Sequence, residues 1–117
     1  MRDRVAAEVR GRRAEALAGL WLQLKGWRIL ARRVRVPGGE IDLVARRGRT
    51  LAFVEVKQRA TAGAASYALD EPRLARVAAA AEQLAHRYGN GCDMIRIDVV
   101  YIVPGRLPRH QENVWSG

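Results

Sequence analysis

Apolar residues recur along the chain with two different spacings. Between about residues 4 and 25 they recur every three or four positions, which predicts an amphipathic helix that stops at Gly26. The apolar stripe of this helix comprises Ala14, Leu17, Leu20, Trp21 and Leu24. A second helical stripe follows residues 70–72, where acidic residues and a proline favour a helix start, and it ends at Tyr88.

Four other segments have the apolar and β-branched composition of strands. They are residues 27–36, 40–45, 51–57 and 94–103. Turns at residues 37–39 and 46–49 separate the first three strands. The stretch after Pro104 has no such pattern, and we expect it to be irregular and partly exposed.

The predicted order of elements is helix, three strands, helix, strand. The second helix can act as a right-handed crossover between two parallel strands. The sequence therefore predicts an α/β fold with a mixed central sheet flanked by helices. With 117 residues the chain is long enough for one such domain, and we expect its ordered core to span about residues 8–104.

The composition is that of a water-soluble protein without membrane segments. Hydrophobic residues make up 49% of the chain, but no apolar run approaches the roughly 20 residues that a spanning helix needs. The charged first residues lack the apolar stretch of a signal peptide. Cys92 is the single cysteine, which excludes an internal disulfide and a multi-cysteine zinc site. We expect a cytoplasmic protein.

The charge balance favours a polyanionic partner. There are 21 Lys and Arg against 12 Asp and Glu, which gives a net charge of +9 and a pI of about 11.1. Nucleic acid is the expected partner, although genomic codon bias toward arginine is a simpler source of the same composition. The arginines expected to form one basic rim that holds phosphates are Arg32, Arg33, Arg35, Arg46, Arg47 and Arg49.

Three charged residues interrupt strands that are otherwise apolar. Glu55 and Lys57 are two positions apart on a predicted strand, so their side chains lie on one face. Pairing across the turn at Gly48 would bring Asp42 beside Glu55. Two adjacent carboxylates suit a hard cation such as Mg²⁺ or Mn²⁺, and the Lys57 ammonium would stabilise charge on a phosphate.

Each of these residues also has a purely structural interpretation. Asp42 and Glu55 could form ion pairs with arginines such as Arg46 or Arg59. Lys57 favours function, because in an arginine-rich chain a lysine indicates that a compact charge is wanted. Two other acids are more ambiguous: Glu40 shares the face of Asp42 or caps the preceding turn, and Asp98 reads more readily as a buried structural acid than as a functional one.

An aspartate followed on the next strand by Glu-x-Lys resembles the motif of the PD-(D/E)XK nuclease superfamily. The segments GEIDLVA (residues 39–45) and FVEVK (residues 53–57) resemble the paired signature of the YraN-like family of small bacterial proteins. Residues 11–15, 26–30 and 96–100 also match that family. The resemblance covers roughly residues 8–115.

That family is similar to archaeal Holliday-junction resolvases, so the resemblance implies a restriction-endonuclease-like fold. It implies that Asp42 and Glu55 are metal ligands and that Lys57 is the catalytic cation. Glu15 would be a further acidic member of the site, and Gln58 an accessory polar group. Two departures from the family pattern are notable: Ile41-Asp42 keeps only the acid of the "PD" pair, and Pro72-Arg73 stands where relatives often carry a lysine.

The sequence therefore predicts a metal-dependent endonuclease that acts on DNA, with branched, recombination or repair intermediates as candidate substrates. A homodimer is expected in that case, because cutting a junction requires two sites at a fixed separation. One alternative is a nucleic-acid-binding module of the same fold that does not cleave, as a subunit of a larger complex. The other is an interaction protein whose carboxylates are purely structural.

Overall fold

A computed structural model describes residues 2–60 and 71–115 of the chain, with side chains described in residues 11–60 and 72–115. Seven elements follow one another along the chain. They are α1 (Arg2–Leu24), β1 (Arg28–Val36), β2 (Gly39–Arg47), β3 (Thr50–Gln58), α2 (Glu71–Tyr88), β4 (Met94–Ile102) and β5 (Arg109–Gln111). None of the described helices is long and apolar enough to cross a membrane.

The strands form one mixed sheet in the order β1-β2-β3-β4-β5. The pairs β1–β2, β2–β3 and β4–β5 are antiparallel, whereas β3 and β4 are parallel. The helix α2 lies between these two parallel strands in the sequence, as a crossover requires. The predicted α/β fold with a mixed sheet flanked by helices is therefore confirmed.

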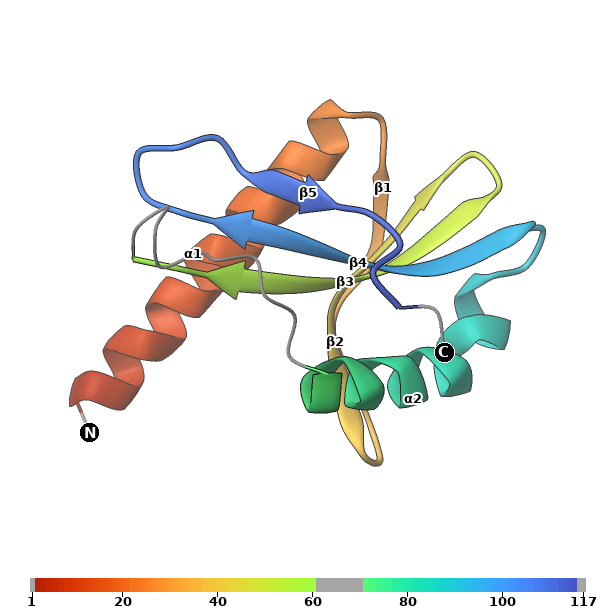
Figure 1. Cartoon of the computed structure of the whole chain (residues 1–117), viewed down its shortest axis with the longest axis horizontal. Coiled ribbons are helices and arrows are strands. Elements are labelled where there is room, and N and C mark those ends of the chain that lie inside the picture. Colours follow the sequence, from red (N-terminus) through yellow and green to blue (C-terminus); the bar gives the residue numbers. More distant parts are fainter. Residues whose placement is uncertain (1, 61–70, 116–117) are drawn as a thin grey trace.

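The two helices cover opposite faces of the sheet, so the core has two layers (Figure 1). The strand β3 shows how the sequence divides between them. Leu51 and Phe53 pack with the buried side chains of α2, whereas Ala52 and Val54 pack with those of α1. Since side chains alternate along a strand, this register places the next odd-numbered residues of β3 toward the α2 face.

The predicted apolar stripe of α1 is largely wrong. Of its members only Ala14 is buried, while Leu17, Leu20 and Leu24 are 51%, 53% and 74% exposed. The buried face of the helix instead follows Ala14, Ala18 and Leu22 at a spacing of four residues. Helical periodicity is compatible with both faces, and the small residues allow the helix to approach the sheet closely.

The end of the chain is more regular than predicted, because β5 pairs with β4 and a buried acid holds the residues that follow. Asp98 is fully buried on β4. Its carboxylate accepts hydrogen bonds from the Arg96 guanidinium, from His110 Nε2 at 2.7 Å and from the Asn113 backbone N–H at 2.9 Å. Burial opposes ionisation, but the bonds from His110, Asn113 and Arg96 hold the pKa of Asp98 below its usual value. Asp98 is thus the structural acid that its apolar strand favoured.

Candidate active site

Asp42 lies at the point where β2 and β3 separate. The ladder between these strands runs from the pair Arg47–Thr50 to the pair Leu43–Val54 and ends there. One residue further, the Asp42 carboxylate accepts a hydrogen bond from the Val56 backbone N–H, with Oδ2 2.8 Å from the nitrogen. The side chain thereby satisfies a backbone donor that β2 no longer reaches, and this bond fixes the position of the carboxylate.

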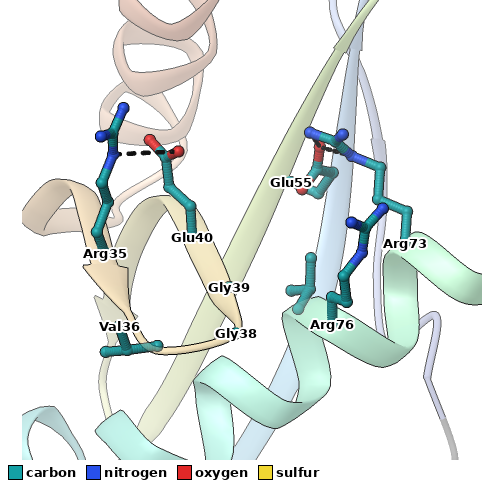
Figure 2. A pocket seen from close by; sticks show the side chains of 9 residues that line it. Arg35, Val36, Gly38, Gly39, Glu40, Glu55, Arg73 and Arg76 are labelled. Atoms are coloured by element: carbon teal, nitrogen blue, oxygen red, sulfur yellow. Dashed lines mark hydrogen bonds and ion pairs between the residues drawn. The ribbon is translucent and has the colours of Figure 1, made fainter.

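Glu55 is buried on β3 and forms an ion pair with α2. The glutamate is 2% exposed, and its Oε1 lies 2.7 Å from both Nε and Nη2 of Arg73. Figure 2 shows this arginine reaching from the helix to the strand. Arg46 and Arg59, which the sequence suggested as ion-pair partners of the acids, bind backbone carbonyl oxygens instead. Arg46 donates to the carbonyls of Gly48 and Asn90, and Arg59 donates to that of Gln58.

The carboxylates of Asp42 and Glu55 influence each other strongly. Burial and the charge of Glu55 raise the pKa of Asp42 to about 7, against the opposing effects of the Val56 N–H and Arg73. The charge of Glu15 raises it further. The structure therefore brings the three predicted acids within electrostatic reach of one another.

Glu15 enters this group from α1 and carries its own counter-charge. Its Oε1 lies 2.6 Å from Nε of Arg33 on β1. Arg33 thus balances Glu15, and Arg73 balances Glu55. Neither Asp42 oxygen is paired with a cation within the described residues.

Lys57 and Gln58 diverge, although they are adjacent in sequence. Lys57 is 7% exposed, and the register of β3 places it on the same face as Glu55. Within residues 11–60 and 72–115 its ammonium forms no ion pair. Gln58 is exposed and lines a groove with Arg13 and Leu17 of α1. The structure therefore does not place Gln58 beside the other predicted site residues.

The donor set fits a hard divalent cation. Among the described residues, no three acidic, histidine or cysteine side chains are close enough together to hold a metal ion. What the site offers is the pair Asp42 and Glu55, in which burial and then the charge of Glu55 raise the pKa of Asp42. Mg²⁺ typically uses one or two carboxylates and takes its other ligands from water and phosphate. A cation between these oxygens would remove the repulsion.

A hollow of about 600 Å³ opens beside Glu55, between the β1–β2 turn and α2 (Figure 2). It is lined by Arg35, Val36, Gly38, Gly39, Glu40, Glu55, Arg73, Arg76 and Val77. Glu40 faces this hollow and pairs with Arg35 at 3.5 Å. The two walls meet closely at Gly39, where a Cβ atom would lie 2.8 Å from the Arg76 carbonyl oxygen and 3.0 Å from the Ala80 side chain.

The six arginines expected to form one basic rim lie at separate places. Arg35 is opposite Glu40 near one end of the β1–β2 hairpin, whereas Arg46 is opposite Arg28 at the other. These positions are six residues apart along β2, about 20 Å at the usual rise of a strand. Most of the six also have partners inside the protein. Arg33 pairs with Glu15, Arg47 stacks on Trp27, Arg49 pairs with Asp93, and Arg32 packs on Gly19 of α1.

Arg73 and Arg76 are the site residues that sequence reasoning missed. Position 73 was considered only as a departure from the family pattern. The available signal was the spacing of three residues, which places both arginines on one side of the first turns of α2. That these turns face Glu55 depends on how the helix crosses the sheet, which local sequence does not specify.

Comparison with known proteins identifies close relatives. A family model described as "Uncharacterised protein family UPF0102" matches residues 14–102. A UPF0102 protein of Sphingopyxis alaskensis is 61% identical over 97% of both chains. A second, of Rhizorhabdus wittichii, is 56% identical over 100% of this chain and 99% of the relative. A third, of Caulobacter vibrioides, is 49% identical over 96% of this chain and 90% of the relative.

Solved structures include a protein of similar fold. It is Hjc, a Holliday junction resolvase from Archaeoglobus fulgidus, with a TM-score of 0.59. The match covers 86% of this chain and 73% of the resolvase, at 22% sequence identity. At this level of identity the likeness concerns the fold, and it agrees with the restriction-endonuclease-like architecture expected from the sequence.

Proposed function

The chain belongs to the UPF0102 family, the YraN-like proteins that its sequence resembles, and on that premise we propose that it is a metal-dependent nuclease that hydrolyses phosphodiester bonds in DNA. The observation that carries the proposal is the convergence of Asp42 and Glu55 where β2 and β3 separate, with Lys57 on the same face. Burial and the charge of Glu55 raise the pKa of Asp42 to about 7, and carboxylates perturbed in this way are typical of functional sites. The resolvase-like fold supports the same reading.

The residues of the site divide the chemistry among them. Asp42 and Glu55 would hold Mg²⁺ or Mn²⁺, and a divalent cation supplies positive charge where a phosphate is attacked. The Val56 N–H orients the Asp42 carboxylate. Lys57 provides a compact ammonium that stabilises negative charge on the phosphate oxygens, a task for which its buried position makes it more effective than an exposed cation. Glu15 is a further acid that orients water at the edge of the site.

DNA is the proposed substrate class, and branched recombination or repair intermediates are the preferred substrates. The net charge of +9 favours binding to a polyanion, and the fold is shared with a protein described as a Holliday junction resolvase. Cutting both strands of a junction needs two sites, so the active form would be a homodimer. We expect it to act in the cytoplasm, where the bacterial chromosome lies.

The test is a cleavage assay with purified protein, plasmid DNA and a four-way junction in Mg²⁺ or Mn²⁺. Asp42→Asn, Glu55→Gln and Lys57→Met should each lower the cleavage rate by about 10²–10³-fold, as removal of a group that stabilises developing charge does. Glu82→Gln, which changes an exposed acid further along α2, serves as the matched control and should cut normally. A wild-type chain that binds Mn²⁺ but cuts neither substrate would contradict the proposal.

One observation favours the second candidate, a DNA-binding module without cleavage. Arg73 already balances the charge of Glu55, so that carboxylate is satisfied without a metal. In this case DNA binding would depend steeply on salt and would survive Asp42→Ala and Glu55→Ala, with no cutting in any metal. Binding assays on these two variants separate the candidates.

A further inference from the structure

Among the described residues that line the hollow beside Glu55, cationic side chains outnumber acidic ones. Three guanidinium groups line it, those of Arg35, Arg73 and Arg76, against the two carboxylates of Glu40 and Glu55. Arg35 pairs with Glu40, and Arg73 pairs with Glu55. In residues 11–60 and 72–115, no hydrogen bond or ion pair holds the Arg76 guanidinium. A site with an unbalanced cation at an open surface suits an anionic ligand.

The ion pair between Arg73 and Glu55 is unequal in burial. The Glu55 side chain is 2% exposed, whereas that of Arg73 is 51% exposed. Leaving a buried carboxylate without a counter-charge is costly, so Arg73 can leave Glu55 only when another cation replaces it. The half-exposed Arg73 side chain, by contrast, is already in contact with solvent. The geometry therefore allows an exchange, in which one cation displaces another.

We propose that Arg73 exchanges partners: it balances Glu55 while no divalent cation is bound, and it turns to a DNA backbone phosphate when a cation binds that carboxylate. Arg76 holds the same stretch of backbone from the next turn of the helix, so the hollow is a phosphate subsite next to the cleavage site. The inference rests on the proposed function, because it takes Glu55 as a metal ligand. It gives the site a link between metal binding and DNA binding.

Three features of the hollow suit a backbone phosphate. Guanidinium groups match phosphate oxygens with paired hydrogen bonds. Arg73 and Arg76 are three residues apart, so their side chains lie on the same side of α2. Both lie in the first turns of the helix, where the dipole favours an anion. The hollow is open along the β1–β2 turn rather than closed around a small molecule (Figure 2), which favours a continuous chain over a free phosphate.

The first measurement is the affinity for Mn²⁺ without DNA, by titration calorimetry. Arg73→Gln removes the competing cation and should tighten Mn²⁺ binding by about tenfold, equivalent to about 1.4 kcal/mol. Arg76→Gln should leave it unchanged, as should Arg87→Gln, an exposed arginine at the far end of the same helix. Thermal unfolding of each variant reports whether it is folded, and Arg73→Met, which also removes the charge, is the substitute if Arg73→Gln is not. Unchanged Mn²⁺ affinity in a folded Arg73 variant would overturn the exchange.

The second measurement is DNA affinity in Ca²⁺ and in EDTA over a series of salt concentrations. Arg76→Gln should weaken binding in both conditions by about tenfold and lower the salt slope by about 1. Arg73→Gln should weaken it only in Ca²⁺, because only then does the arginine face the DNA. Equal losses in both conditions would contradict the exchange. Competition by millimolar inorganic phosphate in wild type, but not in Arg76→Gln, would assign the hollow to free phosphate instead.

Neither measurement depends on DNA cleavage. If the wild-type chain cuts no DNA but both results hold, the phosphate subsite stands and the nuclease proposal fails. If the wild-type chain cuts DNA and Arg73→Gln has wild-type Mn²⁺ affinity, the exchange fails and the nuclease proposal stands.

Discussion

Asp42 is subject to two opposing influences that act on the same carboxylate. The Val56 N–H stabilises its charged form, while burial and the neighbouring Glu55 favour the protonated form. The second influence prevails, and the pKa rises to about 7. The ionised form of the Asp42 carboxylate is therefore less favourable in the folded protein than in water.

This opposition has a defined pH dependence. Because the folded-state pKa of about 7 exceeds the ordinary value of 3.8, the folded state binds the proton more tightly than the unfolded state, and its stability falls as pH rises between those values. Asp42→Asn removes the effect, since the amide oxygen can still accept from Val56. In EDTA, the melting temperature of the variant should exceed that of wild type at pH 8, with a smaller difference at pH 5. A variant less stable than wild type at pH 8 would contradict this account.

The acids and the lysine could be predicted at the residue scale because strand alternation is a local rule. Glu55 and Lys57 share a face for that reason alone. The position of Asp42 near Glu55 could be predicted from the hairpin that joins their two strands. The role of Arg73 could not be predicted, because it depends on which part of a helix meets which part of a strand across the crossover. Gln58 was assigned by resemblance, and strand alternation places it on the opposite face.

At the scale of elements, α1 carries leucines on both its buried and its exposed face, so equal substitutions can test which face packs on the sheet. Leu22 is fully buried between helix and sheet, whereas Leu24 is 74% exposed. Leu22→Ala should lower the free energy of unfolding by about 3 kcal/mol, through lost burial and a cavity. Leu24→Ala, the same chemical change two residues away, should alter it by less than about 0.5 kcal/mol. Urea unfolding measures both, and a larger loss for Leu24→Ala than for Leu22→Ala would mean that the face predicted from the sequence is the buried one.

The long elements were predictable and the shortest one was not. The four strands of nine residues and both helices are long enough for composition and spacing to reveal them, although the buried face of α1 was not the predicted one. The strand β5 has three residues, too few for a period. Its position follows from contacts with β4, where Asp98 binds His110 and Asn113. The residues that form these contacts are far apart in sequence, so no local pattern predicts them.

At the scale of the whole molecule, Asp98 links the centre of the sheet to the end of the chain. It joins Arg96 on its own strand to His110 on β5, whose ring contacts Trp27 before β1. Both the carboxylate and the imidazole are buried. One side chain therefore connects the last strand, the central strands and the start of the sheet.

Asp98→Asn should lower the free energy of unfolding by about 3 kcal/mol, because it removes the buried charge that faces Arg96 and leaves that arginine only its half-exposed partner Glu112. The pKa of Asp98 is held below its ordinary value, so its contribution is present above the unfolded-state pKa and is lost as pH falls through the folded-state pKa. Wild type and variant should therefore converge in acid. Urea unfolding at pH 7 and pH 3 checks this, with Asp93→Asn, in an exposed pair with Arg49, as the control. A constant difference at both pH values would contradict the linkage.

The closest approach between the β1–β2 hairpin and α2 occurs at Gly39, where a single added carbon would meet the backbone of Arg76. The hairpin can thus lie this close to the part of α2 that carries Arg76 because residue 39 has no Cβ atom. Scanning by truncation, the usual search for important positions, removes side chains and so passes over a residue that has none to remove. In this molecule the width of the hollow depends on the absence of a side chain at Gly39, so only a substitution that enlarges this residue would reveal its importance.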